Sequence, residues 1–320
     1  MSKETLKQIG SETIAPFTYP STLLRAQRQE GPSGLDIALF GLPYDGGTIA
    51  RDGARHGPGQ MRQMSINIRG TNSSTGVSPF ETCRIADIGD ALVNTFDHEA
   101  SVDMMTDFCA RVREAGAWPL AAGGDHLITL PVLRGTVDPK NPVGLVHFDA
   151  HPDTHDMIFG TRLNHATPFR RAVEEGLVDP RRHVMIGLRG TTRPTDAAID
   201  WAREVGITMI DADEFFDLGA KATAARAREI VGGGPVYVTL DIDGMDPADA
   251  PGTGSPEPGG MRMRDMQVML RGLRGLDIVG GDVNEVSPPL DPTGYTAFNA
   301  VHLMFEMLCL MAENRVARGL

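Results

Sequence analysis

The sequence has no concentration of positive charge. Its 30 lysines and arginines stand against 42 aspartates and glutamates, which gives a formal net charge of -12. No Lys/Arg-rich block or basic stripe reverses this balance anywhere along the chain. Because nucleic-acid-binding surfaces are built from clustered basic side chains, we predict no nucleic-acid partner. An acidic chain is better suited to a cationic small molecule.

Cysteine is scarce. Cys83, Cys109 and Cys309 are odd in number, widely separated and set in apolar or helical surroundings. This pattern excludes a disulfide framework and a CxxC metal clip. A reducing cytoplasm is therefore the expected compartment.

Long apolar runs are missing as well. No stretch approaches the roughly 18–20 consecutive apolar residues that a membrane span requires. The segment MSKETLKQIGSETIAPF at the start lacks the apolar region of a secretory signal. We predict that the protein neither enters a membrane nor is exported.

The chain divides into a polar beginning and a long patterned remainder. Residues 1–34 are polar and rich in proline and glycine, which predicts an N-terminal arm of a kind that often covers a neighbouring subunit. Residues 35–320 are predicted to form one domain, because a chain of 320 residues with 41% hydrophobic residues can bury a large core.

Within this domain, short apolar runs rich in Val, Ile and Leu alternate with stretches of helical periodicity. The predicted strands are 35–43, 118–124, 143–149, 183–189, 207–211, 235–243 and 276–286. The predicted helices are 99–115, 127–136, 167–176, 195–205, 218–231, 264–274 and 297–313. Continuously apolar strands indicate burial on both faces, so we predict an α/β fold with three α/β/α layers and a mostly parallel central sheet.

Polar residues whose burial costs free energy follow two of these strands. Asp149, His151 and Asp153 in HFDAHPD are spaced i, i+2, i+4, and Asp241 and Asp243 in TLDIDGMDP repeat the i, i+2 spacing. If the extended backbone continues, each set points to one side. The apolar residues before each motif draw the carboxylates toward the interior, where unpaired charge is very costly. We therefore predict a compensating cation at the carboxyl ends of the strands, where open parallel sheets hold their ligands.

The ligand set indicates the type of metal. A single aspartate at a strand end is more often a helix or turn cap, but five such residues in two motifs are not explained that way. With His126 from GGDH the set has four carboxylates and two imidazoles, which is too oxygen-rich for structural zinc and favours Mn²⁺. Six ligands suggest two metals, which about 3.5–4 Å apart can activate a water between them. The other histidines are interpreted as structural, and His147 as core packing directed away from the metals.

Together these motifs resemble the ureohydrolases, the arginase and agmatinase family of binuclear manganese enzymes. GLPYDGGTIARDGARHGP, APGTGSPEPGG and DVNEVSPPLD extend the likeness to the agmatinase branch, over residues 35–315. The resemblance implies an arginase-like fold and two Mn²⁺ per subunit. It places one metal on His126, Asp149, Asp153 and Asp241, and the other on Asp149, His151, Asp241 and Asp243. Asp149 and Asp241 would bridge the two.

The same resemblance implies roles beyond the metals. His165 falls where the family has a catalytic histidine that passes a proton to the departing amine, and Glu285 where a carboxylate pairs with the substrate guanidinium. Both are predicted to bind substrate, together with His155, Met157 and Asn164. The sequence departs from the family pattern at His155, at Ala166 and at Asn284, all near the site, so the substrate is the open question.

The pattern is most similar to guanidinobutyrase and guanidinopropionase, which implies an ω-guanidino acid as substrate and release of urea and an amine. Agmatine is the next alternative, and then an unusual guanidine or a biguanide such as a dimethylbiguanide, with Ni²⁺ in place of Mn²⁺. Formimino-group hydrolysis is another enzymatic alternative. A non-catalytic subunit of a hetero-oligomer is the alternative of a different class. The resemblance also implies a homo-oligomer, either a trimer or a hexamer.

Overall fold

The computed structural model describes residues 5–10, 15–191 and 196–319. Over these residues nine strands form one sheet in the order β1-β3-β2-β4-β9-β8-β5-β6-β7, and each pair of neighbours is parallel. The strands are β1 (Gln27–Arg28), β2 (Ile37–Leu42), β3 (Ile85–Asp90), β4 (Trp118–Gly123), β5 (Val143–Phe148), β6 (Val178–Leu188), β7 (Thr208–Asp211), β8 (Pro235–Asp241) and β9 (Asp277–Asn284). The central strands are almost wholly buried, as strands covered on both faces must be.

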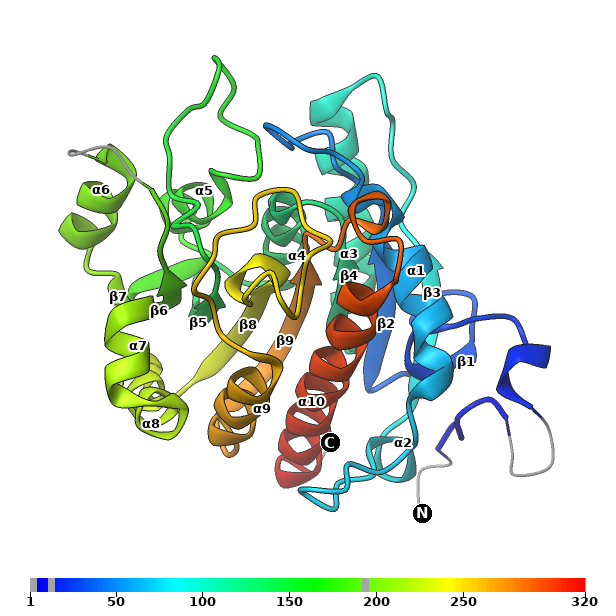
Figure 1. Cartoon of the computed structure of the whole chain (residues 1–320). Coiled ribbons are helices and arrows are strands. Elements are labelled where there is room, and N and C mark those ends of the chain that lie inside the picture. The colour runs from blue at the N-terminus through cyan, green and yellow to red at the C-terminus, as the bar shows by residue number, and fades with distance from the viewer. Residues whose placement is uncertain (1–4, 11–14, 192–195, 320) are drawn as a thin grey trace.

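Helices cover both faces of this sheet (Figure 1). The described helices are α1 (Gly57–Met64), α2 (Pro79–Thr82), α3 (His98–Glu114), α4 (Thr129–Thr136), α5 (Pro168–Glu174), α6 (Ala197–Val205), α7 (Ala212–Leu218), α8 (Ala220–Val231), α9 (Met263–Gly272) and α10 (Tyr295–Ala317). Helices α1, α8, α9 and α10 lie on one side, and α3, α4 and α5 on the other. The predicted three-layer α/β/α fold is confirmed.

The alternation of side chains along β8 assigns each residue to a layer. Val236, Val238 and Leu240 belong to the hydrophobic cluster that includes α8, α9 and α10. Tyr237 belongs to the cluster that includes α3 and α4. Because strand side chains alternate with period two, Thr239 and Asp241 share the face of Tyr237. The polar end of β8 is thereby directed toward the layer of α3 and α4.

Part of the predicted arm packs on its own chain. Leu23 and Leu24 are completely buried in the core, and β1 pairs with β3 at the edge of the sheet. The Leu23 N–H donates to the buried carboxylate of Asp87 (2.9 Å), which also pairs with Arg62 (2.8 Å). Residues 27–28 therefore extend the sheet, and Leu23 and Leu24 add to its core. Cover of a neighbouring subunit by the arm, and the domain boundary at residue 34, stay predictions.

Several elements were not predicted from the sequence. These are β1, β3, α1, α2 and α7. The sequence GPGQMRQM of α1 begins with residues typical of turns, yet Pro58 stands at the start of the helix, where its missing N–H costs nothing. Strand β3 has the sequence IADIGD, in which two aspartates and a glycine obscure the apolar pattern. For the predicted helix 195–205, residue 195 lies outside the described residues, and α6 begins at Ala197.

Helix α10 is long and apolar enough to cross a bilayer, by length and composition alone. However, 83% of its most apolar window is buried inside the structure. The helix packs against α1, α9 and β9, in the front layer of Figure 1. Its apolar surface is thereby used for the core of the domain.

Candidate metal centre

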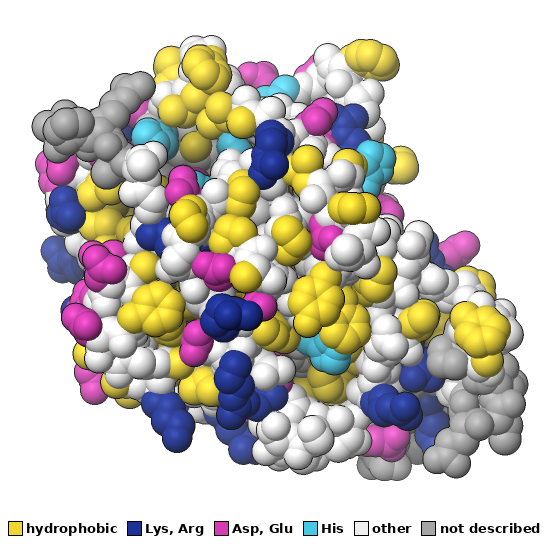
Figure 2. All heavy atoms as spheres, viewed as in Figure 1, with side chains coloured by type: hydrophobic (Ala, Val, Ile, Leu, Met, Phe, Trp, Pro, Cys, Tyr) yellow, Lys and Arg dark blue, Asp and Glu magenta, His cyan; other side chains and the backbone are white. Residues whose placement is uncertain are grey.

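The six predicted metal ligands lie at the carboxyl ends of three strands near the middle of the sheet. His126 follows β4, Asp149 follows β5 directly, and Asp241 is the last residue of β8. Loops after these strands gather at the top of the molecule in Figure 1. Histidine side chains are visible among hydrophobic ones at the same end in Figure 2. Strand ends that lie far apart in sequence thus meet at one edge of the sheet.

One group of ligand atoms is centred on His126. Its Nδ1 lies 3.0 Å from Asp149 Oδ2, 3.0 Å from Asp153 Oδ2 and 3.2 Å from Asp241 Oδ2. All four residues are buried, with at most 6% exposure. Despite these neighbours, His126 Nδ1 has no hydrogen-bond partner among the described residues. An orphaned nitrogen facing three carboxylate oxygens fits coordination of one cation by all four groups.

A second group lies beside the first and shares Asp149 with it. His151 Nδ1 is 3.1 Å from Asp243 Oδ2 and 3.5 Å from Asp149 Oδ1, and the ligand atoms of these three residues lie within 4.8 Å of one another. Asp241 belongs by distance to the first group, so its role as a second bridge stays a prediction. The structure nevertheless brings all six predicted ligands together in two adjoining groups.

Short backbone contacts hold the aspartates in place. Asp149 Oδ1 accepts from the His151 N–H (2.6 Å), and Asp241 Oδ1 accepts from the Asp243 N–H (2.8 Å). Such contacts two residues along the chain are typical of Asx turns. Gly244 permits the two loops to meet, because a Cβ there would lie 3.0 Å from the backbone nitrogen of Asp149. With the i, i+2 spacing, each aspartate side chain therefore accepts a hydrogen bond from the backbone N–H of the next ligand, which stabilises the turn between them.

The carboxylates repel one another strongly. Burial, followed by the charges of Asp243 and Asp149, raises the pKa of Asp241 well above its ordinary value. Burial also raises the pKa of Asp243 to about 6, although His151 opposes this. For Asp149, burial is outweighed by contacts with His126, His147 and His151, and its pKa is lowered well below the ordinary value. Cations bound between these groups would offset the repulsion among the carboxylates that the neighbouring histidines do not neutralise.

The prediction that His147 is directed away from the metal ligands was wrong, whereas its packing in the core is confirmed. Its Nε2 lies 2.8 Å from Asp149 Oδ2, so it contacts a predicted metal ligand instead of being directed away from the site. The reason is the period of the strand: His147 precedes Asp149 by two residues and therefore lies on the same face. With its remaining surface His147 packs on Phe169, with ring centroids 4.1 Å apart. His147 helps to hold Asp149 in position.

Glu285 and His165 form a pair beside the first group. Glu285 Oε1 accepts from the backbone N–H of His126 (2.9 Å) and lies 2.9 Å from His165 Nδ1. Burial lowers the pKa of His165, but the charges of Glu285, Asp153 and Asp125 outweigh it and raise the pKa to about 10. Glu285 itself has a positive φ of 61°, a conformation that non-glycine residues rarely adopt and that concentrates at functional sites. The two predicted catalytic residues are thus in direct contact.

A cavity of about 930 Å³ opens beside the cluster. Its lining includes four proposed metal ligands, His151, Asp153, Asp241 and Asp243, and also His155, Met157, His165 and Ala166. Asn164 is not among the lining residues: it is buried, donates to the Thr161 carbonyl (3.1 Å) and accepts from the Ala166 N–H (3.0 Å). Four of the predicted substrate contacts therefore lie at the cavity or pair with a residue there, whereas the amide of Asn164 shapes the loop.

Arg189 also lines this cavity, but its donors are committed to the protein. Its Nε and both terminal nitrogens donate to backbone carbonyls of Gly187, Asp243, Gly244, Met245 and Glu257 at 2.7–3.2 Å. The Gly187 carbonyl lies near the end of β6, and the other carbonyls belong to the segment after β8. The guanidinium therefore ties the end of β6 to the segment that follows β8.

Asp125 is a residue of the site that the sequence interpretation missed. It is completely buried, and its Oδ2 accepts from the Gly47 N–H (2.7 Å), while the Gly47 carbonyl accepts from the His165 N–H (3.1 Å). Burial and the charge of Glu285 raise its pKa to about 8. The sequence could have indicated Asp125, because it is a charged residue that directly precedes the predicted ligand His126 in GGDH. Asp125 holds the loop that in turn holds His165.

Comparisons with known proteins identify what this arrangement is similar to. The arginase family matches over residues 35–309. Guanidinopropionase of Pseudomonas aeruginosa is 48% identical over 316 residues, covering 98% of each chain, and guanidinobutyrase of the same organism is 43% identical over 314 residues, covering 97% of this chain and 98% of the relative.

Among solved structures, proclavaminate amidino hydrolase from Streptomyces clavuligerus has a TM-score of 0.89 at 40% identity and covers 93% of this chain and 99% of that one. The likeness extends over nearly the full length of every chain named. The predicted resemblance and the predicted fold are both confirmed.

Proposed function

Because this chain belongs to the arginase family, we propose that it hydrolyses the guanidino group of a small molecule to urea and an amine at a binuclear metal centre. The observation that carries the proposal is the convergence of Asp149, Asp153 and Asp241 on the orphaned Nδ1 of His126. Burial of so many carboxylates is stable only with compensating cations.

The residues present fit two divalent ions. His126, Asp149, Asp153 and Asp241 would hold one, and Asp149, His151 and Asp243 the other, which we propose Asp241 to share. We propose Mn²⁺, with Ni²⁺ as the alternative, because four carboxylates and two imidazoles form an oxygen-rich set. When bound, such a pair supplies Lewis acidity and an activated water at neutral pH.

Glu285 is the carboxylate that we assign to the substrate guanidinium. The two N–H donors of a guanidinium match the two oxygens of a carboxylate, and burial strengthens the pairing. Glu285 is 3% exposed, and its contact with the His126 backbone fixes its distance from the metal ligands. It would hold the guanidino carbon in line with the attacking water, which supplies proximity.

His165 is the group that we assign to proton transfer. It lines the cavity and contacts Glu285, so it is within reach of a substrate whose guanidinium pairs with Glu285. Because its pKa is raised to about 10, it holds a proton at neutral pH. It would give this proton to the departing amine as the C–N bond breaks.

For the substrate we propose an ω-guanidino acid, and agmatine as the next candidate. The support is the identity of 48% and 43% to enzymes named guanidinopropionase and guanidinobutyrase.

We further propose a homo-oligomer, either a trimer or a hexamer, located in the cytoplasm. All three cysteines are buried thiols, as suits a reducing compartment.

Metal analysis together with a urea-release screen tests the function. Purified protein is expected to contain about two ions per chain and to release urea from at least one guanidino compound. The screen would include guanidinobutyrate, guanidinopropionate, agmatine, arginine and substituted biguanides, each with and without prior chelation. Protein that binds no metal and releases no urea would contradict the proposal and favour a non-catalytic subunit.

Two substitutions of His165 separate proton transfer from positioning. His165→Ala is expected to lower kcat about 100-fold, because general acid catalysis typically contributes 10²–10⁴-fold. His165→Asn can still donate to Glu285 from its amide but cannot titrate, so it is expected to lower kcat by a similar factor while leaving KM near that of the parent. Steady-state kinetics would measure both. Full activity of the asparagine variant would show that His165 only positions Glu285.

A further inference from the structure

A row of polar side chains crosses the interior of the sheet behind the metal ligands. His147 on β5, Thr239 on β8 and Asp282 on β9 are register neighbours on three adjacent strands. All three are completely buried. A carboxylate in the middle of a covered sheet is costly, so its position requires an explanation beyond packing.

Asp282 is surrounded by neutral donors. Its Oδ1 accepts from the hydroxyl of Thr239 (2.6 Å) and the amide of Asn284 (2.7 Å), and its Oδ2 accepts from the hydroxyl of Tyr237 (2.6 Å). Across the part of the chain that the structure describes, no lysine or arginine forms an ion pair with it. The hydrogen bonds leave Asp282 as an acceptor on both oxygens.

These contacts fix the direction of the next hydrogen bond. Thr239 has one hydroxyl proton, and at 2.6 Å from Asp282 that proton is donated to the carboxylate, which can only accept. The Thr239 oxygen must then accept from His126 Nε2, which lies 2.9 Å away. His126 therefore carries a proton on Nε2, which leaves Nδ1, beside Asp149, Asp153 and Asp241, as the ring nitrogen that can hold a metal.

We propose that Asp282 and Thr239 are positioning residues that hold His126 in the tautomer and orientation that a metal requires. The proposal rests on the proposed metal centre. Metal-ligating histidines commonly donate their second ring N–H to an acceptor, which fixes the ring and raises its basicity. Here the acceptor is a hydroxyl whose own proton goes to a buried carboxylate, so the negative charge acts on the ligand through Thr239.

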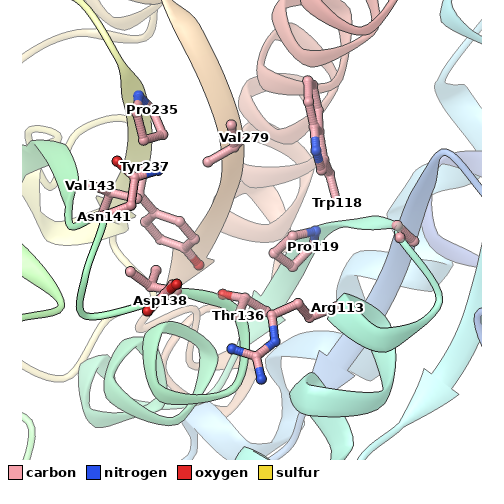
Figure 3. Close-up of a pocket in the computed structure, with 13 residues that line it drawn as sticks. Arg113, Trp118, Pro119, Thr136, Asp138, Asn141, Val143, Pro235, Tyr237 and Val279 are labelled. Carbon is pink, nitrogen blue, oxygen red and sulfur yellow. The ribbon is translucent and has the colours of Figure 1, made fainter.

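The far side of Asp282 is anchored at the opposite end of the sheet. Tyr237, which donates to Oδ2, extends its ring from β8 among the residues that line a cavity of about 300 Å³ (Figure 3). Trp118, Pro119 and Val143, at the amino ends of their strands, share that cavity. Tyr237 thus fixes one carboxylate oxygen so that the other faces Thr239.

The arrangement acts on one of the two metals. His126 belongs to the first ligand group, whereas the histidine of the second group is His151, which has a half-buried side chain and contacts Asp149 and Asp243. Among the described residues, His151 makes no hydrogen bond or ion pair with Thr239 or Asp282. Loss of the Thr239 hydroxyl should therefore weaken one metal site and spare the other.

The test is a titration of the full-length, chelator-stripped protein with Mn²⁺ alone, followed by calorimetry. In Thr239→Val, which keeps the shape of the side chain, one of the two dissociation constants is expected to rise about 10–100-fold and the other to stay unchanged. Thr239→Ser keeps the hydroxyl and is expected to titrate like the parent. Thr223→Val is the matched control, because Thr223 on α8 is equally buried and its hydroxyl donates only to the Gly219 carbonyl.

Thermal melting of each variant accompanies the titrations. If Thr239→Val does not fold, Asp282→Asn carries the same prediction, since it removes the charge and keeps the size. Parent protein that binds two Mn²⁺ while Thr239→Val binds them equally well would overturn this proposal and leave the proposed function intact. Failure of the serine variant to restore binding would also overturn it. Parent protein that binds no Mn²⁺ would overturn the proposed function itself.

Discussion

Asp241→Asn is expected to lower kcat/KM at least about 1,000-fold and to reduce the metal content below two ions per chain. Asparagine keeps the size of the side chain but removes the charge that faces His126 Nδ1 at 3.2 Å. A metal centre contributes several kcal/mol of transition-state stabilisation, and each 1.36 kcal/mol corresponds to a factor of ten in rate. Kinetics with the best substrate of the urea screen, and metal analysis of the same preparation, measure both effects.

Asp211→Asn is the matched control for this substitution. Asp211 lines the same cavity but caps helix α7 by accepting from the Glu214 N–H (2.9 Å), and asparagine is an equally good cap. Near-parent activity and metal content are expected. If Asp241→Asn kept both as well, Asp241 would not be a metal ligand.

Glu285→Gln is expected to lower kcat/KM about 100-fold or more while two ions remain bound. Removing one partner of a buried charge pair costs roughly 2–5 kcal/mol, and part of this loss is expected in KM because the pairing holds the bound substrate. The amide oxygen of glutamine can still accept from the His126 N–H, so the metal ligands should stay in place. Metal analysis beside kinetics distinguishes this result from that of Asp241→Asn.

Glu306→Gln is the corresponding control. Glu306 on α10 is 5% exposed, close to the 3% of Glu285, and pairs with Arg271. It lies outside the cavity lining, so the variant is expected to melt at a lower temperature but to keep its activity per folded molecule. Unchanged KM and kcat in Glu285→Gln would remove Glu285 from the substrate site.

The sequence was most informative where the spacing of residues is tied to strand geometry. The spacing of Asp149, His151 and Asp153 predicted that these residues converge, and they do reach one site, but Asp153 lies in the group of His126 and His151 in that of Asp243. The extended backbone assumed for this prediction ends at Phe148, and Asp153 has a positive φ of 48°. Long apolar runs such as 143–149 and 235–243 became β5 and β8. Period-two alternation is a local property, so one chain segment carries enough information to predict it.

The same rule also exposes the error at His147. A histidine two residues before Asp149 has to share its face, and applying the period consistently along 143–149 would have placed it at the site. Thr239 and Asp282 carry a similar signal, since both are polar residues within otherwise apolar strands. Their partnership was not predictable from spacing, because it depends on β8 and β9 being neighbours in the sheet.

The elements that were missed depend on tertiary contacts. Strand β1 has only two residues, and it is a strand because β3 lies beside it. The turn-forming residues at the start of α1 disguise a helix that packs against α10. Local propensity is a weak prior that such contacts override.

The division of labour between strands and loops has a consequence for retargeting this enzyme. The proposed metal ligands are held at strand ends and by hydrogen bonds inside the sheet, whereas Ile49, His155, Met157 and Ser255 come from three loops around the cavity. Loop sequences tolerate change far better than buried strands. A library that varies these four positions together can therefore be screened for activity on new guanidino substrates while the proposed metal ligands are left unchanged.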